Sequence, residues 1–256
     1  LGRTPKRLAE QIAAGHLLQL DAGVVTPVDA TATDGASDAS QQTGNEAAKR
    51  GRLFLVMVSC GLDADVVHRV HSHREERYQS GSKKGAHISY MSYVKPIMKT
   101  IGSYDFPEVK IEVLEGGDET AYGQKRFGTT SPVSPYTLEH ARWAFVFNLP
   151  CYGWGLPLVP KAVGTDGKFD HCLFDGKSFW HGFKYAAFGQ CGSIHRFLGD
   201  VRLGQGVKYR LSSEGEVPYQ LDGDPGGKLP VDVEMLRNRF TVLAPEWAVQ
   251  KFGHPQ

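Results

Sequence analysis

The chain has 256 residues, of which 41% are hydrophobic, and is long enough to bury a core in one large domain or two small ones. Its 29 basic and 28 acidic residues give a formal net charge of +1, without the positive excess typical of nucleic-acid-binding proteins. No apolar run reaches the roughly 20 residues that span a bilayer, and no signal-peptide pattern is present, so we expect any membrane contact to be peripheral.

The first predicted element is a helix over residues 4–15. Thr4 is a candidate N-cap, Pro5 takes the first helical position, and Gly15 ends the helix. A strand follows in "LLQLDAGVV". Residues 28–50 are small and polar without periodicity, which indicates a disordered insertion between two strands.

A buried strand and a helix follow the insertion. The run "RLFLVMVSCG" over residues 52–61 predicts one continuous buried strand. Apolar residues at helical spacing predict a helix over 62–73, the charged stretch 73–85 reads as a loop, and 86–102 as a second helix kinked at Pro96.

From there the pattern is mainly β. Strands are predicted in 108–115, 141–150, 167–176, 199–213, 217–222, 228–236 and 239–245. One helix, over 177–189, carries an aromatic face that we expect to pack into the core. The fold class is therefore α+β and mainly β, an antiparallel sandwich-like sheet structure with a few helices.

The four cysteines, Cys60, Cys151, Cys172 and Cys191, lack C-x-x-C spacing. This favours reduced thiols in a cytoplasmic protein over a disulfide framework or a zinc site. The histidines of "HRVHSH" over 68–73 do not have the spacing of a known zinc motif either.

The stretch "LDGDPGG" contains a hairpin signal, because Gly223 accepts positive φ and Asp222 caps its own turn. If the turn instead begins after Asp224, the two carboxylates are alternate strand residues and face one cleft. The similar-looking "EGGDET" over 115–120 reads as a β-turn rather than a phosphate-binding loop, because no helix follows it.

Two other stretches carry candidate binding residues. Asp63 and Asp65 in "GLDADVV" open a helix, where the macrodipole favours negative charge, so a structural and a functional reading are about equally supported. In the long loop over 147–170, Asn148 follows a buried strand and Asp166 with Gly167 predicts a second hairpin turn. Such loops beside strand ends are where binding residues usually lie.

In this order, these segments resemble the C-terminal, lipid-acceptor domain of the diacylglycerol kinase and sphingosine kinase family, which shares a superfamily with the NAD kinases. The resemblance covers most of the chain. It implies a linker helix over 1–19 and an acceptor-binding domain over 20–256. The family's glycine-rich nucleotide-binding loops are expected in an N-terminal domain preceding Leu1, and the family usually has Glu where this chain has Asp224.

The resemblance implies a lipid kinase that uses ATP and Mg²⁺ at the cytoplasmic surface of a membrane, its partners being a lipid substrate and its own N-terminal domain. Asp222 is then the expected catalytic base and Asp224 its acidic partner. Asp65 is expected to bind the lipid head group and Asn148 to shape the loop beside the acceptor. Asp200 is a candidate ligand for a structural metal.

Two other functions remain open. The chain is alternatively a catalytically silent lipid-binding or regulatory module of the same fold, or part of an NAD-kinase-like enzyme. A Gly-Gly-Asp-Gly loop encoded before Leu1 separates an active kinase from a silent module. In either case we expect the chain to be inactive toward ATP by itself.

Overall fold

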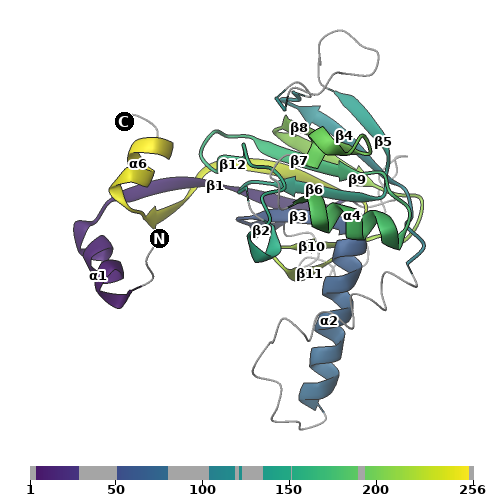
Figure 1. The fold of residues 1–256 in the computed structure, drawn as a ribbon, viewed down its shortest axis with the longest axis horizontal. Helices are drawn as coiled ribbons and strands as arrows, with labels where there is room; N and C mark the ends of the chain where they lie inside the picture. Colours follow the sequence, from purple (N-terminus) through teal and green to yellow (C-terminus); the bar gives the residue numbers. More distant parts are fainter. Residues whose placement is uncertain are drawn as a thin grey trace, which may run out of the picture.

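The computed structural model describes residues 4–28, 51–79, 104–118, 121–122, 135–150, 152–189 and 194–253. Two six-stranded antiparallel sheets form the body (Figure 1). Sheet A has the strand order β2-β1-β12-β9-β4-β5, and sheet B has the order β11-β10-β3-β6-β7-β8. The prediction of a mainly β, antiparallel, sandwich-like fold is therefore confirmed.

The elements follow one another along the chain with these bounds. They are α1 (Pro5–Ala14), β1 (Leu17–Pro27), β2 (Arg52–Phe54), β3 (Met57–Gly61), α2 (Leu62–Gln79), β4 (Val109–Glu115), β5 (Tyr136–Ala141), β6 (Trp143–Phe147), η2 (Gly153–Gly155), β7 (Phe169–Phe174), α4 (Phe179–Gly189), α5 (Ile194–Phe197), β8 (Val201–Gly206), β9 (Lys208–Ser212), β10 (Pro218–Leu221), β11 (Asp224–Lys228), β12 (Val231–Leu243) and α6 (Glu246–Phe252).

The main core lies between the sheets, because alternate residues of each strand face the opposite sheet. Phe54 of sheet A stacks on Phe169 of sheet B with ring centroids 5.5 Å apart. The inner face of sheet B is formed by Val58, Cys60, Ala144, Val146, Phe169, Leu173, Tyr219 and Leu221. Cys60 is buried here as a free thiol.

The outer face of sheet B carries a second apolar cluster. Met57, Phe145, Phe147, Cys172 and Phe174 point away from sheet A and are covered by the segment 156–162 together with α4 and α5. Cys172 is also a free, buried thiol. Sheet B is thus buried on both faces, which explains why all six residues of β7 are buried.

An arm made of β1 and β12 extends from the body and ends in α1 and α6 (Figure 1). Where the arm joins the body, Leu20 pairs with Phe240 but Ala22 pairs with Leu236, so Asp21 alone opposes residues 237–239. The Asp21 carboxylate fills this bulge: Oδ1 accepts the N–H of Asn238 at 2.8 Å, and Oδ2 accepts the N–H of Gly167 at 2.7 Å.

Several sequence-based boundaries need correction. The predicted continuous strand 52–61 is wrong, because the chain breaks at residues 55–56 and continues from sheet A into sheet B. Helix α2 extends to Gln79, beyond the predicted end at 73. The predicted strands 228–236 and 239–245 are one strand, β12, and β5 was not predicted as a separate strand.

Of the other expectations, one is confirmed, one is corrected, and two lie outside the described residues. Helix α1 runs from Pro5 to Ala14 and ends at Gly15 with φ 68, although Thr4 makes no side-chain cap bond. The aromatic face of α4 was expected in the core, but Trp180 is 74% exposed. Residues 29–50 of the predicted insertion and the predicted helix 86–102 lie outside the described residues. None of the described helices combines the length and apolar character needed to cross a membrane.

Candidate active site

The β10–β11 hairpin turns at Asp222 and Gly223. Leu221 pairs with Asp224, and the two turn residues have φ values of 51 and 94. This is the two-residue turn that Asp-Gly favours. The alternative in which the turn begins after Asp224 is wrong, so Asp222 and Asp224 are not neighbours on one side of a strand. Both residues are exposed.

Three backbone N–H groups hold the Asp222 carboxylate. Oδ2 accepts the N–H of Leu55 at 2.7 Å, while Oδ1 accepts those of Val56 and Met57 at 2.9 and 2.8 Å. The N–H of Asp222 in turn donates to the carbonyl oxygen of Met57 at 3.0 Å. An ionised carboxylate has about four acceptor positions, so one position on Oδ2 remains for another donor. The carboxylate is therefore fixed in orientation on an exposed residue.

Asn148 binds the carbonyl side of residues 55–57, whose N–H groups hold the Asp222 carboxylate. Its Nδ2 donates to the carbonyl oxygens of Leu55 and Asp21, both at 2.8 Å, and its backbone N–H donates to that of Val56 at 2.9 Å. Asn148 is fully buried. It therefore ties together the end of β6, the arm junction and the 55–57 turn, and it supports the Asp222 site from behind.

A buried polar network lies directly behind the hairpin turn. Gln220 accepts the N–H of Gly223 through Oε1 at 2.7 Å, and its Nε2 donates to Ser59 Oγ at 2.8 Å and to Asp63 Oδ2 at 3.0 Å. Ser59 Oγ donates to the same Asp63 oxygen at 2.5 Å. The hydroxyl of Tyr152 donates to Asp63 Oδ1. The network connects the turn that carries Asp222 with the start of α2.

The electrostatics of this network follow from its burial. Burial raises the pKa of Asp63 despite the three hydrogen bonds donated to its carboxylate. Burial, followed by the nearby Asp63 carboxylate, raises the pKa of the Tyr152 hydroxyl well above 10. The Tyr152 hydroxyl therefore keeps its proton at neutral pH and donates a hydrogen bond to Asp63.

Asp65 lies two residues after Asp63 in α2. Its carboxylate accepts the Arg69 Nε–H at 2.7 Å within α2, and its side chain is 20% exposed. The structure thus connects Asp63, rather than Asp65, to the Asp222 turn. Sequence reasoning noted both aspartates as helix-start residues but missed the network. Gln220, a polar residue between apolar neighbours in a buried strand, is the signal that points to it.

A second buried carboxylate, Asp170, lies toward the other edge of the outer face of sheet B. Asp170 Oδ1 accepts the Tyr122 hydroxyl at 2.7 Å and Gln205 Nε2 at 3.0 Å. Burial raises the pKa of Asp170 to about 6, because these two hydrogen bonds only partly offset the lost solvation. Through Phe147, which pairs with both Asp170 and Met57, this carboxylate lies at the same end of sheet B as Asp222.

Asp200 lies at the opposite end of sheet B, where β7 ends and β8 begins. Its Oδ2 accepts Lys184 Nζ at 2.9 Å and the Tyr185 hydroxyl at 2.7 Å. Burial acts to raise the pKa of Asp200, but these hydrogen bonds outweigh it and the pKa is lowered. Within the described part of the chain, no three His, Cys, Asp or Glu side chains form a group able to hold a metal. Asp200 as a metal ligand stays a prediction.

Two further motifs have structural roles. Gly116 has φ 65 at the end of β4, and Asp118 exchanges two backbone hydrogen bonds with Gln205, of 2.9 and 2.8 Å, while Glu119 and Thr120 of "EGGDET" lie outside the described residues. His68, the first histidine of "HRVHSH", places Nε2 2.9 Å from the carbonyl oxygen of Tyr219 and ties α2 to β10.

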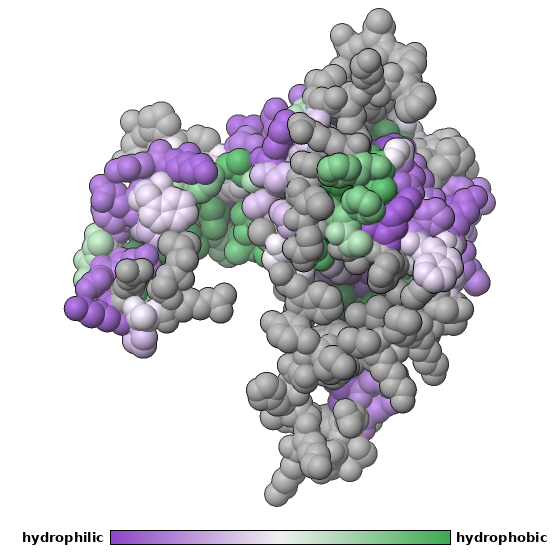
Figure 2. Space-filling view, in the orientation of Figure 1, coloured by the Kyte–Doolittle hydropathy of each residue, from purple (hydrophilic) through white to green (hydrophobic). Residues whose placement is uncertain are grey.

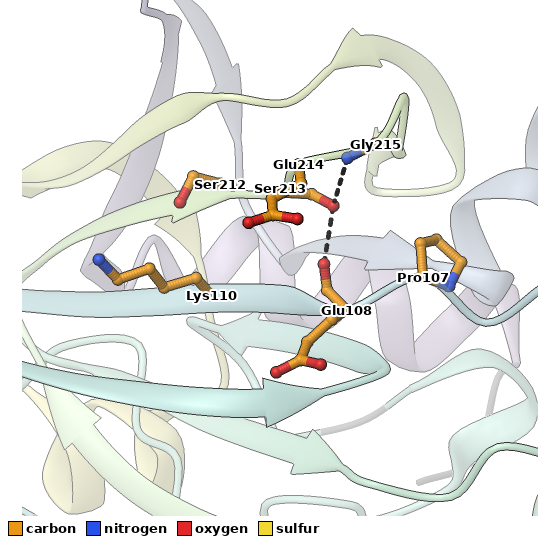
Figure 3. A pocket seen from close by; sticks show the side chains of 7 residues that line it. All are labelled: Pro107, Glu108, Lys110, Ser212, Ser213, Glu214 and Gly215. Atoms are coloured by element: carbon orange, nitrogen blue, oxygen red, sulfur yellow. Dashed lines mark hydrogen bonds between the residues drawn. The ribbon is translucent and has the colours of Figure 1, made fainter.

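A separate, open surface pocket lies between the start of β4 and the end of β9 (Figure 3). Ser213 Oγ donates to the carbonyl oxygen of Glu108 at 2.7 Å, and the N–H of Gly215 donates to Ser213 Oγ at 3.3 Å. The pocket is lined by Pro107, Glu108, Lys110, Ser212, Ser213, Glu214 and Gly215. With two carboxylates, one lysine and no large apolar side chain, it does not fit a lipid acceptor.

Solved structures of known proteins share the fold of this chain. No protein-family model and no curated protein matches the chain. Among solved structures, a protein provisionally identified as a diacylglycerol kinase from Bacillus anthracis Sterne matches with a TM-score of 0.50 and 15% identity, over 93% of this chain and 60% of its own. A diacylglycerol kinase structure from the same strain matches with a TM-score of 0.50 and 12% identity, over 96% of this chain and 61% of its own.

The chain has a diacylglycerol-kinase-like fold. It spans about 60% of the length of these solved structures. At 12% and 15% identity the likeness concerns the fold alone. The chemistry has to be argued from the residues of this chain.

Proposed function

We propose that the chain is the acceptor-binding and catalytic-base part of an ATP-dependent lipid kinase. Its substrate is a lipid hydroxyl of the diacylglycerol or the sphingoid and ceramide type. The observation that carries the proposal is the Asp222 carboxylate, fixed by three backbone N–H groups on an exposed turn with one acceptor position left open. The diacylglycerol-kinase-like fold supports the reaction class.

In this role Asp222 accepts the proton of the lipid hydroxyl at the open position of Oδ2 while the hydroxyl oxygen attacks the phosphoryl group. The O–H bond of the lipid breaks as its new O–P bond forms, and the bond from the γ-phosphorus to the bridging oxygen breaks to release ADP. A general base has to be held within hydrogen-bond reach of the proton it removes, and the three N–H donors support this role because they fix the orientation of the carboxylate. Such a base contributes about 100- to 10,000-fold in rate.

The other site residues take supporting roles. Asn148 and Gln220 position the two turns that carry and hold Asp222. Asp65, paired with Arg69 on α2, is proposed to bind the lipid head group, because α2 packs against β10 and β11. Asp224 remains the proposed acidic partner, at the first position of β11.

Among the described residues, no three His, Cys, Asp or Glu side chains form a group able to hold a metal. In this proposal, ATP and Mg²⁺ bind to the family's nucleotide-binding loops in an N-terminal domain of the full-length protein. When bound, ATP supplies the phosphoryl group and Mg²⁺ neutralises its charge. The exposed apolar side chains of Leu8 and Ile12 on α1 offer such a domain a surface at the end of the arm.

The test is a transfer assay with radiolabelled ATP on the full-length protein. Diacylglycerol, sphingosine, ceramide and NAD are offered separately, and lipid binding is measured in parallel. We expect phosphorylation of one lipid and none of NAD. Lipid binding without any transfer would instead support a silent lipid-binding module, and phosphorylation of NAD would support the NAD-kinase-like alternative. Saturable kinase activity of residues 1–256 alone would contradict the division of the active site between two domains.

A further inference from the structure

Three aromatic side chains project from α4 and α5. Trp180 is 74% exposed, Phe197 60% and Phe188 38%, and the rings of Phe188 and Phe197 lie 5.8 Å apart. Figure 2 shows a hydrophobic patch on the face of the body in the region where Figure 1 labels α4. Contiguous exposed apolar surface of this kind marks an interaction site rather than ordinary protein surface.

The opposite side of the two helices fixes this orientation. Tyr185 of α4 and Ile194 of α5 are 3% and 1% exposed and pack into the outer core of sheet B. The Tyr185 hydroxyl accepts the N–H of Gly176 at 3.0 Å and donates to Asp200 at 2.7 Å. Because these groups are anchored inward, Trp180, Phe188 and Phe197 are held outward in the folded protein.

The charge of the segment matches an anionic partner. Residues 176–199 contain no Asp or Glu, although 28 of the 256 residues are acidic, about one in nine, and they include Lys177, Lys184 and Arg196. The carboxylates that flank the segment are already engaged: Asp175 with Arg202 at 2.6 Å and Asp200 with Lys184 at 2.9 Å. Because Lys184 and Asp200 neutralise each other, the remaining positive charge of the segment comes from Lys177, which is exposed, and from Arg196.

A run of aromatic rings connects this face with the candidate active site. Tyr185 packs on Phe174 with ring centroids 4.5 Å apart, and Phe174 packs on Phe145 at 5.7 Å. Phe145 in turn packs on Tyr152 at 5.5 Å, and Tyr152 donates its hydroxyl to Asp63. The outer face of sheet B is thus apolar and continuous between α4 and the network behind Asp222.

We propose that the α4–α5 face is a membrane-docking surface, which places Trp180, Phe188 and Phe197 in the interface of an anionic phospholipid bilayer. Aromatic rings combined with lysine suit this interface, because the rings enter the region between head groups and acyl chains while the ammonium group stays at the anionic surface. The inference rests on the proposed function, since a lipid kinase has to reach its substrate in a bilayer.

Vesicle flotation of the full chain tests the surface. Vesicles of phosphatidylcholine with phosphatidylglycerol, free of diacylglycerol and sphingolipid, exclude any contribution from substrate binding. We expect the double variant Trp180→Ala/Phe197→Ala to lower the partition coefficient at least tenfold. Lys177→Glu should lower it about fivefold on anionic vesicles and much less on phosphatidylcholine alone, because a basic residue near an anionic surface contributes about 1 kcal/mol.

Trp247→Ala is the matched control, because Trp247 is 48% exposed but lies on α6 at the end of the arm. It should bind vesicles like the parent chain. Equal binding by the parent and the Trp180→Ala/Phe197→Ala variant, or an equal loss in Trp247→Ala, would overturn the proposal. A parent chain that is dimeric in light scattering and becomes monomeric only in the double variant would instead assign the face to a second copy.

Activity separates this proposal from the proposed function. In the full-length enzyme, Trp180→Ala/Phe197→Ala should lose activity on vesicle-embedded lipid and retain it on a soluble short-chain acceptor. An inactive parent enzyme whose vesicle binding still requires Trp180 and Phe197 would end the kinase proposal and leave the docking surface standing. Unchanged circular dichroism of each variant confirms that the fold is intact.

Discussion

Two carboxylates hold turns of this protein by the same chemistry, in opposite surroundings. Asp21, at the junction between arm and body, accepts the N–H groups of Asn238 and Gly167 and is 1% exposed. Asp222, on the β10–β11 hairpin, accepts three N–H groups from residues 55–57 and is exposed. Each replaces strand-to-strand hydrogen bonds where the regular pairing stops.

The two carboxylates differ in their access to solvent and therefore to a substrate. A carboxylate that is enclosed on all sides stabilises the fold but cannot reach a substrate. An exposed carboxylate with an unused acceptor position has the same fixed orientation and can also accept a proton from outside. Backbone N–H donors therefore act as a scaffold at Asp21 and, under the proposed function, as preorganisation of a base at Asp222.

The largest stability effect is expected at the enclosed site. Asp21→Ala removes two charge-assisted hydrogen bonds and leaves two backbone N–H groups without a partner at the arm junction. We expect the free energy of unfolding to fall by about 4 kcal/mol, since each such bond contributes about 1.5–3 kcal/mol. Urea unfolding at pH 7 measures this. A loss below about 1 kcal/mol would show that Asp21 does not hold the bulge.

Asp170 is a buried carboxylate whose two side-chain hydrogen-bond donors do not fully replace the lost solvation, so its pKa is raised. Its pKa of about 6 in the folded protein lies above the ordinary value of 3.8, so the folded state binds this proton more tightly. The stability it contributes is complete below about pH 4 and is lost as the pH rises through 6. Between pH 4 and pH 7, Asp170→Asn should therefore gain about 2 kcal/mol relative to the parent chain.

The comparison with Asp170→Asn is needed because the neighbouring His171 acts in the opposite direction. Burial lowers the pKa of His171 from 6.5 to about 3, so its contribution is lost as the pH falls from about 6.5. His171 is present in both proteins and cancels in the difference. Urea unfolding at a series of pH values measures it, and a pH-independent difference would contradict the raised pKa of Asp170.

A smaller effect is expected from the network behind the hairpin. Gln220→Met keeps the side-chain length but removes the hydrogen bonds to Ser59, Asp63 and Gly223. Leaving buried polar groups without partners costs about 1–3 kcal/mol, so we expect a loss of about 2 kcal/mol. A loss of less than about 0.5 kcal/mol in urea unfolding would show that the network does not support the turn.

The smallest stability effect is expected at the exposed carboxylate itself. Asp222→Asn retains one acceptor oxygen and loses at most one or two of three hydrogen bonds, which water can replace. We expect a loss of about 1 kcal/mol in urea unfolding. A loss as large as that of Asp21→Ala would make Asp222 a structural residue and remove the distinction between the two sites.

Local sequence patterns predict much of this fold. Asp222 and Gly223 form the hairpin turn that their residue types favour, and Pro5 and Gly15 mark the ends of α1. The run 52–61 was misread because its apolar residues give no sign of a break. The break at 55–56 exists because their N–H groups bond to Asp222, more than 160 positions away. No local pattern contains that contact.

The candidate site was predicted only in part for the same reason. Asp63 and Asp65 look alike in the sequence, and only the approach of β10 places Gln220 against Asp63. Trp180 was expected in the core because aromatic residues at helical spacing usually are buried. Its exposure depends on which side of α4 Tyr185 anchors, and the helix sequence alone does not specify that side.

The most direct test of the account is the turnover of the full-length enzyme with Asp222→Asn, beside Asp224→Asn as the neighbouring carboxylate. We expect Asp222→Asn to lower kcat by about 100- to 10,000-fold with KM for the lipid nearly unchanged, because it removes the base without removing the acceptor site. Asp224→Asn should cost less than about tenfold. Near-normal turnover of a folded Asp222→Asn enzyme would contradict the assignment of Asp222 as the catalytic base.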